Sequence, residues 1–438
     1  MNRIVEKGKT LLIDGPASVT VTSGKAESFG YLTSSTRKIV IREGKKLPLA
    51  VEEKAIFDIS LAETANVEEV EGNTIPPSWT KACEELANFE KKPTIAMVLG
   101  IVDSGKTSFC TYLVNNMVRQ KKKIAVLDGD LGQSDVGPPC TVAYTFVTRP
   151  TTDLFNLQAK NAVFIGVTSP NGVIDRVVDG LTSLEKEIMH NDPDVVVINS
   201  DGWIEGEEAV KYKVRLVEEI KPDVIFFIQQ KDELTLLMNV LGNFRKVVVD
   251  SPSVISQRSR EKRKNLRELG YIKYLRNAKV QSSPLDWLKI EDSELFGMSK
   301  KISSFREASK IYNLLGMKPL HFTTQKDRIS IIIGRKRWIN PENLKKLEET
   351  TKKKVIVIRK GEEEGLLTGL YDSKRKFLGI GVVQEIDYRR RTLKILTPVP
   401  KNIAIASVGK VKLDKNMKEA PALGEENQSE STTFSKLF

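Results

Sequence analysis

The stretch TIAMVLGIVDSGKT, at residues 94–107, decides the fold class of this 438-residue chain. Its first six residues form an apolar run that is typical of a buried parallel strand. Residues 100–107 then match the P-loop pattern in full, with two glycines, a lysine and a threonine at the required spacing. Because residues 108–119 continue as a helical stretch, the sequence predicts a strand, a phosphate-binding loop and a helix in that order.

Each part of this motif has a physical role in holding a nucleoside triphosphate. Gly100 and Gly105 let the backbone curl so that successive amides face the phosphates, and the following helix adds its positive N-terminal end. We expect Lys106 to reach the β- and γ-phosphates and the Thr107 hydroxyl to hold Mg²⁺. The predicted nucleotide contacts also include Asp103, Ser104 and Ser108.

The wider region from about 80 to 315 alternates apolar strands with helices, one of them over 207–220. Further buried strands are expected at 124–127, 163–167, 195–198, 224–228 and 247–249. This alternation is typical of a doubly wound α/β domain with a parallel sheet, in which ligands bind beyond the carboxyl ends of the strands.

Two β-rich regions flank this domain. Residues 1–75 contain short β-branched runs between Gly, Pro and Ser, which favour a small sandwich or barrel, and we expect 75–79 (IPPSW) to be a linker. Residues 326–413 are expected to form a C-terminal β domain. The polar residues 420–438 are too poor in apolar side chains to form a core, so we expect a disordered tail.

Composition limits the classes of function. Hydrophobic residues make up 40% and charged residues 29%, as in globular proteins, and no apolar run approaches the ~20 residues of a membrane-spanning helix. The first residues lack the apolar core of a signal peptide, so we expect a cytoplasmic protein with no membrane partner. Three separated cysteines and two histidines argue against a zinc site, a disulfide framework and any Cys/His or Ser/His couple.

The net charge of +12 favours a polyanionic partner, because cationic side chains neutralise phosphates. A solvated Lys/Glu-rich surface, as in heat-adapted proteins, explains the same excess, so charge alone leaves both interpretations open. Basic residues stand beside aromatic ones at 335–338, 374–377 and 388–391. These clusters suit either a strand-binding surface or charged hairpin turns.

Two carboxylates follow the second predicted strand. Asp128 and Asp130, in the stretch DGDLGQ at 128–133, stand just past a strand end beside the P-loop. Such a pair suits a Mg²⁺ shell and a base for an attacking hydroxyl, and which acid is the base stays open. An Asp/Gly turn with an incidental acid pair is the structural alternative.

Two more stretches are candidates for the same site. Residues 199–203, NSDGW, end the strand at 195–198, so Trp203 can stack a base or pack in the core, and Asp201 is a rival metal-supporting acid. Residues 258–267 are the densest basic run of this domain. Arg263 and Arg267 lie four residues apart on one helical face and can both reach a transferring phosphoryl group, unless the run is simply a solvated face.

These four pieces, in this order, resemble the polynucleotide 5′-hydroxyl kinase family, which includes the RNA kinase associated with pre-mRNA cleavage and tRNA splicing and its archaeal relatives. That family has a P-loop, an Asp-x-Asp-x-Gly-Gln motif, a Thr-x-Gly-Trp clasp and an Arg-x-x-x-Arg lid. The second motif is matched here by Asp128, Asp130, Gly132 and Gln133, and the lid by Arg263 and Arg267. In the clasp, Ser200 stands where the family has Thr, before Gly202 and Trp203, so a hydroxyl is kept.

The resemblance covers nearly the whole chain, and the compact length is most like the archaeal members. It implies an N-terminal β domain, a central kinase domain with a lid near 257–275, and a C-terminal β domain. It also implies a reaction in which ATP and the 5′-hydroxyl end of RNA or DNA give ADP and a 5′-phosphate end. RNA-processing proteins are further expected partners.

The resemblance and the residues together suggest one role for each part of the site. Asp128 supports the Mg²⁺ shell and Asp130 accepts the proton of the 5′-hydroxyl, although the two acids can exchange these roles. Gln133 positions the strand end, with Ser200, Gly202 and Trp203 near the bound strand. Arg263 and Arg267 neutralise charge at the transfer step.

Two alternatives use the same fold. A non-catalytic scaffold would bind ATP and rigidify an RNA-processing complex, and such proteins are expected to lose lid or acid residues that this chain keeps. A regulatory GTPase or partitioning ATPase would hydrolyse nucleotide without regard to strand ends. No Asn-Lys-x-Asp guanine-reading tetrad occurs, since residues 229–232 read QQKD.

Overall fold

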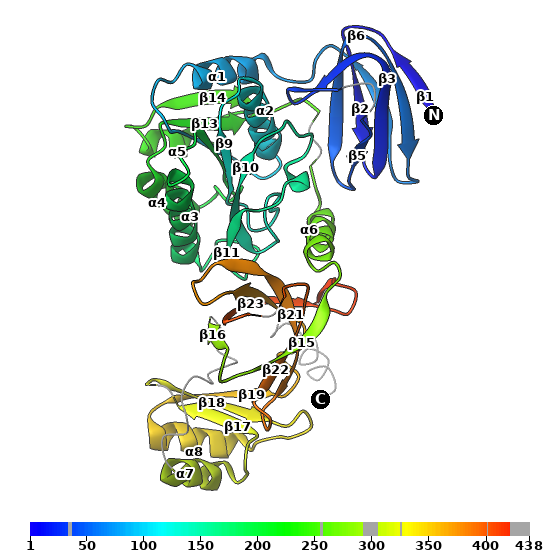
Figure 1. Cartoon of the computed structure of the whole chain (residues 1–438). Coiled ribbons are helices and arrows are strands. Elements are labelled where there is room, and N and C mark those ends of the chain that lie inside the picture. Colours follow the sequence, from blue (N-terminus) through cyan, green and yellow to red (C-terminus); the bar gives the residue numbers. More distant parts are fainter. Residues whose placement is uncertain (34–36, 255–256, 292–304, 325, 401, 421–438) are drawn as a thin grey trace, which may run out of the picture. The chain divides into compact units, whose positions relative to one another are not determined.

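The computed structural model describes residues 1–438 except 34–36, 255–256, 292–304, 325, 401 and 421–438 (Figure 1). The chain divides into two compact units, Met1–Gly270 and Tyr271–Phe438. The tail expected from 420 lies, beyond Ala420, outside the described residues. In the part of the chain that is described, no helix has both the length and the apolar character that crossing a bilayer requires.

The first unit begins with a seven-stranded antiparallel sheet, which confirms the β structure predicted for this region. Its two longest strands, β3 and β6, pair with each other along most of their length. The strands are β1 (Asn2–Val5), β2 (Lys9–Asp14), β3 (Ala17–Ser28), β4 (Tyr31–Leu32), β5 (Ile39–Ile41), β6 (Lys46–Leu61) and β7 (Val67–Glu71).

A second seven-stranded sheet follows, in the order β11-β10-β9-β12-β8-β13-β14, and its last five strands in this order are parallel (Figure 1). The strands are β8 (Thr94–Gly100), β9 (Ile124–Asp128), β10 (Thr141–Val147), β11 (Asn161–Phe164), β12 (Val195–Asn199), β13 (Val224–Gln229) and β14 (Lys246–Asp250). The connecting helices are α1 (Pro77–Ala87), α2 (Lys106–Arg119), the short 3₁₀ turn η1 (Leu154–Asn156), α3 (Ile174–Met189), α4 (Glu207–Ile220), α5 (Thr235–Val240) and α6 (Arg260–Tyr274).

Helices cover both faces of this sheet, so the predicted doubly wound α/β fold is confirmed. On one face, α3, α4 and α5 contribute Leu181, Leu216 and Leu237 to a core cluster. On the other, Trp79 of α1 packs against Phe109 of α2, with ring centroids 5.1 Å apart. Apolar side chains on both faces explain why the strands read as continuous hydrophobic runs.

The region between β9 and β12 differs from the expected pattern. β10 pairs antiparallel with β9, and β11 pairs antiparallel with β10, so the strand predicted at 163–167 lies at the edge of the sheet in an antiparallel pair. The physical reason is the connection: residues 129–140 contain no helix, and a parallel return needs a crossover that a helix usually supplies.

The prediction of a linker at 75–79 was wrong from its third residue onward. Pro77 is the first residue of α1, a position where proline is tolerated because the missing N–H has no partner inside the helix. Trp79 is fully buried, and its indole N–H donates to the Asp250 carbonyl at 2.8 Å. The prolines therefore start a core helix.

The second unit contains two sheets rather than the single β domain expected over 326–413. A seven-stranded sheet is built from β15 (Lys279–Pro284), β16 (Lys289–Glu291), β20 (Leu366–Tyr371), β21 (Phe377–Asp387), β22 (Thr392–Thr397), β23 (Ile405–Leu413) and β24 (Glu419–Ala420). A three-stranded sheet, β17 (His321–Thr324), β18 (Arg328–Ile333) and β19 (Lys354–Arg359), packs with α7 (Phe305–Leu315) and α8 (Pro341–Thr351) around its own core.

The boundary between the units also differs from the expected one near 315. β15 and β16 pair with β22 and β23, more than a hundred residues later in the chain. Residues 279–291 therefore belong to the second unit. Such long-range pairing leaves no local signal in the sequence.

Candidate active site

The P-loop connects β8 to α2 at the carboxyl edge of the central sheet. Gly105 has φ +97°, and a side chain on Gly100 would come within 2.5 Å of Ile228 and 2.6 Å of the Ser104 hydroxyl. These two positions therefore require glycine, one for its backbone conformation and the other for the close approach of its neighbours. The predicted strand-loop-helix order is confirmed.

Lys106 at the start of α2 is almost fully buried, with 6% of its surface exposed. Its Nζ donates to the Ile101 carbonyl at 2.6 Å, a neutral acceptor within the loop. Burial, together with the positive charge of Lys213, lowers the pKa of Lys106 to about 8, against the attraction of Asp130 and Asp201. An anionic ligand beside Nζ would favour the charged form and compensate for this burial.

Asp128, the last residue of β9, is completely buried and is enclosed by the loop that follows it. Its Oδ2 accepts hydrogen bonds from the backbone N–H groups of Asp135, at 2.8 Å, and Val136, at 3.1 Å. Burial, and then the negative charges of Asp135 and Asp130, raise the pKa of Asp128 to about 7. The carboxylate thus organises residues 129–136 around itself.

Asn199 links this acid to the P-loop, a contact that sequence reasoning missed. Its Nδ2 lies 3.0 Å from Oδ1 of Asp128 and 3.5 Å from Oγ1 of Thr107. The contact exists because β12 lies between β8 and β9, with Asn199 in register with both Val98 and Asp128. The only available signal was that Asn199 ends a buried strand, which does not reveal its neighbours.

Asp130 and Gln133 turn toward a cavity in front of Lys106. Asp130 Oδ1 accepts the backbone N–H groups of Gly132, at 3.0 Å, and Gln133, at 2.9 Å. Burial, and then Asp201, raise the pKa of Asp130 above its usual range. Gln133 Nε2 donates to the Arg263 carbonyl at 3.1 Å, which ties this loop to α6.

Arg263 lies over the P-loop, and its partner there is a carboxylate. Its guanidinium Nη2 is 3.6 Å from Oδ2 of Asp103, and it donates to the Arg258 carbonyl at 2.7 Å. Its buried Nε has no hydrogen-bond partner within the described part of the chain. Arg267, one turn further along α6, lines the cavity. The structure therefore brings Arg263 to the phosphate-binding loop and Arg267 to the cavity wall.

The clasp residues lie behind the P-loop rather than in the cavity. Ser200 is buried and donates to the Val98 carbonyl at 2.8 Å, while Trp203 stacks on Tyr212 with centroids 5.9 Å apart. Gly202 approaches the loop so closely that a Cβ would meet Val102 at 2.7 Å. Neither Ser200 nor Trp203 lines the cavity.

Asp201, the rival acid, is committed to a structural ion pair. Its Oδ2 is 2.7 Å from Nζ of the fully buried Lys213 and accepts the Tyr212 hydroxyl at 2.8 Å. Its Oδ1 accepts the Trp203 backbone N–H at 2.9 Å. With these partners Asp201 holds the strand end in place.

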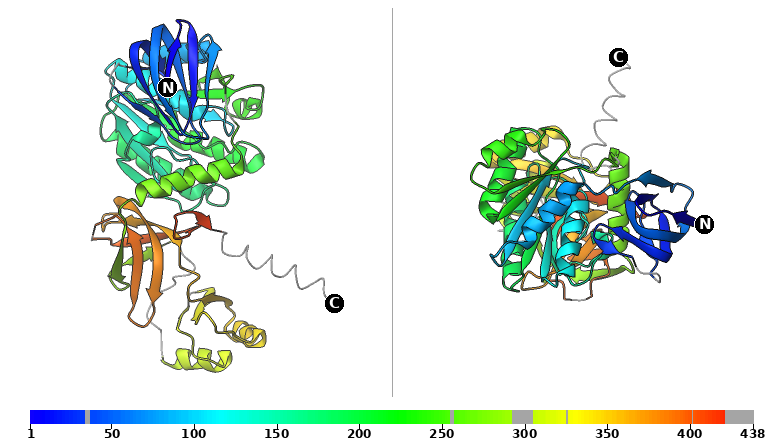
Figure 2. Two further views of the ribbon diagram at one scale, coloured as in Figure 1. Left: turned by 90° about the vertical axis from the view of Figure 1, so that its right-hand side faces the viewer. Right: turned by 90° about the horizontal axis from the view of Figure 1, so that it is seen from above.

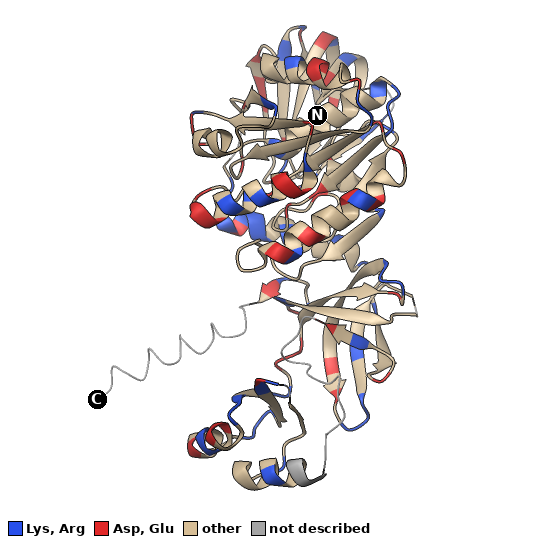
Figure 3. Cartoon of the chain, turned by 90° about the vertical axis from the view of Figure 1, so that its left-hand side faces the viewer, with Lys and Arg blue, Asp and Glu red and all other residues tan. Residues whose placement is uncertain are grey.

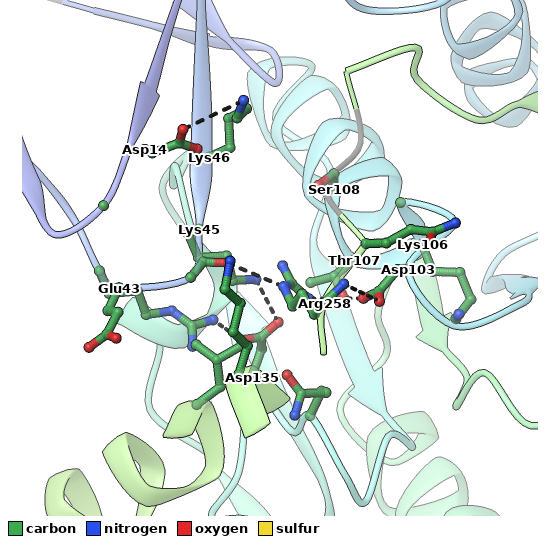
Figure 4. A pocket seen from close by; sticks show the side chains of 18 of the residues that line it. Asp14, Glu43, Lys45, Lys46, Asp103, Lys106, Thr107, Ser108, Asp135 and Arg258 are labelled. Atoms are coloured by element: carbon green, nitrogen blue, oxygen red, sulfur yellow. Dashed lines mark hydrogen bonds and ion pairs between the residues drawn. The ribbon is translucent and has the colours of Figure 1, made fainter. Parts of the chain in front are cut away.

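The turn between β5 and β6 contacts the same loop through charged side chains, and Figure 4 shows one such pair, Lys45 with Asp135. Arg42 and Lys45 both bind Asp135, and the Lys45–Asp135 distance is 3.2 Å. Arg42 also binds Asp153 at 2.7 Å. Burial alone would raise the pKa of Asp153. The positive charges of Lys45 and Arg42 nevertheless hold that pKa well below its usual range. Figure 2 shows the N-terminal strands, in dark blue, beside the central domain.

A cavity of about 500 Å³ opens between these parts, within the usual size range of small-molecule sites. Its walls come from the N-terminal sheet, the P-loop, the loop after β9 and the helix α6. They include Arg42, Lys45, Lys46, Asp103, Lys106, Thr107, Asp130, Gln133, Lys262 and Arg267. The complete lining holds seven cationic and five acidic side chains, so the small positive excess suits an anionic ligand.

Comparison with known proteins agrees with this geometry. Residues 100–277 match the family described as the mRNA cleavage and polyadenylation factor CLP1 P-loop. The chain is 27% identical to a polyribonucleotide 5′-hydroxyl-kinase of Methanocaldococcus jannaschii, over 75% of this chain and 90% of that protein. It is 26% identical to the protein of the same name from Pyrococcus abyssi, over 81% of this chain and 97% of that protein.

A solved structure shares the fold. The Clp1p chain of a wild-type Clp1p–Pcf11p (454–563) complex superimposes with a TM-score of 0.67 at 13% identity, covering 94% of this chain and 97% of that one. The sequence resemblance is thus confirmed: residues 100–277 form a CLP1-type P-loop domain, in a chain related along most of its length to archaeal polyribonucleotide 5′-hydroxyl-kinases.

Proposed function

We propose that this protein is an ATP-dependent polynucleotide 5′-hydroxyl kinase, which transfers the γ-phosphoryl group of ATP to the 5′-hydroxyl of an RNA end and also accepts DNA ends. One observation carries the proposal: Lys106, Asp130 and Arg267 line one cavity, and Arg263 pairs with Asp103, which lines it too. Relatives named as kinases of this class support it. The sequence favours the cytoplasm as the place of this reaction.

The reaction forms a bond between the 5′-oxygen and the γ-phosphorus while the bond from that phosphorus to the β–γ bridging oxygen breaks. ADP leaves with the electron pair of the broken bond, and the proton of the 5′-hydroxyl passes to a carboxylate. Lys106 and the P-loop amides stabilise the charge on the β- and γ-phosphates. Because the transfer needs little covalent help, positioning and charge supply most of the catalysis.

Asp130 is the better candidate for the base. It lines the cavity, and its raised pKa suits a group that must accept a proton. Asp128 is fully enclosed, with hydrogen bonds to both of its oxygens. We therefore assign Asp128 to support of the metal and of the loop.

Mg²⁺ fits the residues present. Magnesium sites on nucleotides use one or two protein oxygens plus phosphate oxygens and water, so a larger cluster of acids is unnecessary. Asn199 brings Thr107 Oγ1 and the Asp128 carboxylate to the same place. In this proposal Thr107 would hold the ion, which would supply neutralising charge at the phosphates, and the Asp128 carboxylate would support that position.

The other predicted residues take supporting roles. Gln133 contacts the strand end, while Ser200, Gly202 and Trp203 shape the P-loop from behind, because their side chains are engaged there. Arg263 exchanges Asp103 for the transferring phosphoryl group when substrates bind, and its unpartnered Nε supplies a further donor. Arg267 acts beside it from the cavity wall.

Because the resemblance includes a complex with Pcf11p, an RNA-processing protein is a further partner we propose for this chain. A catalytically silent scaffold in such a complex would bind ATP without transferring phosphate. The retention of Asp130 and Arg267 at the cavity, and of Arg263 beside Asp103, favours the kinase.

The first prediction concerns the acceptor. Incubation with γ-labelled ATP should label a single-stranded RNA that ends in a 5′-hydroxyl and leave the same RNA with a 5′-phosphate unlabelled, because only the free hydroxyl can attack. ATP binding is measured in parallel. Intact binding with no label on either strand would favour the scaffold, and ATP hydrolysis indifferent to both strands would favour a regulatory ATPase.

The second prediction concerns the base. Asp130→Asn should lower kcat by about 10²–10⁴, the usual contribution of a positioned acid or base, while the Kd for ATP changes little. Single-turnover rates and ATP binding measured on the same preparation separate the two effects. Asp179→Asn, an exposed acid on α3, is the matched control and should retain full activity. A wild-type rate in Asp130→Asn would refute this assignment.

The third prediction concerns the lid. Arg263→Ala should reduce kcat by about 10³, within the range known for arginines at P-loop transfer sites, with a much smaller change in the KM for ATP. Arg260→Ala removes an exposed cation from the same helix and should behave like the wild type. Equal losses in both variants would show that Arg263 acts only through general charge.

A further inference from the structure

The second unit presents an exposed tryptophan that the proposed chemistry does not use. Trp287 is 80% exposed, the largest value among the exposed large hydrophobic side chains of the described residues. It lies in the turn between β15 and β16. A single exposed apolar side chain needs no explanation by itself, so its surroundings decide its meaning.

The turn that carries Trp287 is anchored on both sides of this residue. Leu285 and Leu288 on either side are buried in the core of the seven-stranded sheet, with 8% and 5% exposure. The backbone N–H of Leu285 donates to the Arg391 carbonyl at 2.8 Å, and that of Trp287 donates to the Pro284 carbonyl at 3.1 Å. Because the backbone of this turn is already anchored, the turn needs little further ordering when a flat partner binds the indole.

A second turn, between β21 and β22, carries three arginines and adjoins the turn of this tryptophan. The β15–β22 pairing aligns Pro284 with Thr392, so the two turns are neighbours although they are about a hundred residues apart. Arg391 links them, because its Nη2 binds Asp286 at 2.7 Å. Arg389 and Arg390 are exposed, and the Arg390 side chain retains 85% of its accessible surface.

The acidic groups of this surface are engaged locally. Asp286 binds Arg391, while Asp387 accepts the backbone N–H groups of Arg389 and Arg390 at 3.0 and 2.9 Å and lies 3.9 Å from the Arg390 guanidinium. Three arginines and two aspartates therefore belong to the two turns and their flanking residues, and Glu362 and Glu363 act on Tyr388 from a neighbouring turn. In Figure 3, Lys and Arg also mark several loops of the second unit in blue.

An outward indole beside exposed guanidinium groups is the combination that single-stranded nucleic acid recognises. A base stacks on the aromatic face without sequence preference, and the guanidinium groups contact the adjoining phosphates. An acidic protein segment would satisfy the arginines but would leave the indole face without a matching flat ring. The chemistry of the surface therefore favours a polynucleotide.

We propose that Trp287, Arg389 and Arg390, here called the Trp287 surface, bind a single-stranded stretch of polynucleotide independently of the reacting 5′ end. The inference deepens the proposed function, because it assigns a second, sequence-tolerant contact to the same class of substrate. A strand long enough to occupy both sites binds more tightly than a short one, since the second contact becomes intramolecular.

Binding of a labelled single-stranded RNA that already carries a 5′-phosphate tests this surface without depending on catalysis. Measured by fluorescence anisotropy, Trp287→Ala should weaken binding about tenfold, equivalent to ~1.4 kcal/mol, whereas Trp287→Phe should retain most of the affinity. The double variant Arg389→Ser/Arg390→Ser should reduce the slope of log K against log salt by about 1.4, ~0.7 per lost phosphate contact. Lys211→Ser, an exposed cation on α4, is the control.

Kinase assays on the same variants locate the effect. Trp287→Ala should raise the KM for a long 5′-hydroxyl RNA while leaving kcat, and all constants for a dinucleotide acceptor, unchanged. Unaltered RNA affinity in a folded Trp287→Ala protein would overturn the proposal, and so would a loss of affinity confined to the arginine variant. The proposal would also fail if an acidic peptide abolished RNA binding while substitution of Trp287 left that binding unchanged. If no kinase activity exists at all, a Trp287-dependent loss of RNA binding would still support the surface.

Discussion

The active site depends on one buried carboxylate. Asp128 receives two backbone amides from the loop that follows it and the side-chain amide of Asn199, so the carboxylate determines the conformation of that loop. Asp135 extends the arrangement outward, because its side chain is held by Arg42 and Lys45 of the N-terminal sheet. Removing one partner of a buried ion pair such as Arg42–Asp135 typically lowers the free energy of unfolding by ~3–5 kcal/mol. The site and the packing of the two sheets are therefore coupled.

The charged groups around the cavity have only partial compensation from the protein itself. Burial lowers the pKa of Lys106 and raises that of Asp130, and Arg263 is paired with the P-loop acid Asp103. A triphosphate beside Lys106 supplies the missing negative charge, and an acceptor hydroxyl supplies a proton that Asp130 can take. The proposed reaction uses these same groups, whose charges the protein itself balances only in part.

The sequence predicted the parts of the site that are contiguous in the chain, and missed those that depend on strand order. The P-loop and the Asp128 motif were readable because their chemistry requires fixed local spacing. Asn199 and Arg42 could not be assigned, since their roles arise only when β12 inserts between β8 and β9 and when the N-terminal sheet packs nearby. Trp287 illustrates the same limit, because its arginine neighbours come from a distant strand pair.

The central claim is that phosphate leaving ATP goes to the 5′-oxygen of a strand. A single-turnover measurement with enzyme in excess, following ADP and 5′-phosphorylated RNA from the same samples, tests it most directly. The account predicts that both products appear with the same rate constant and in equal amounts. ADP formed together with free phosphate, with no matching 5′-phosphate ends, would contradict it.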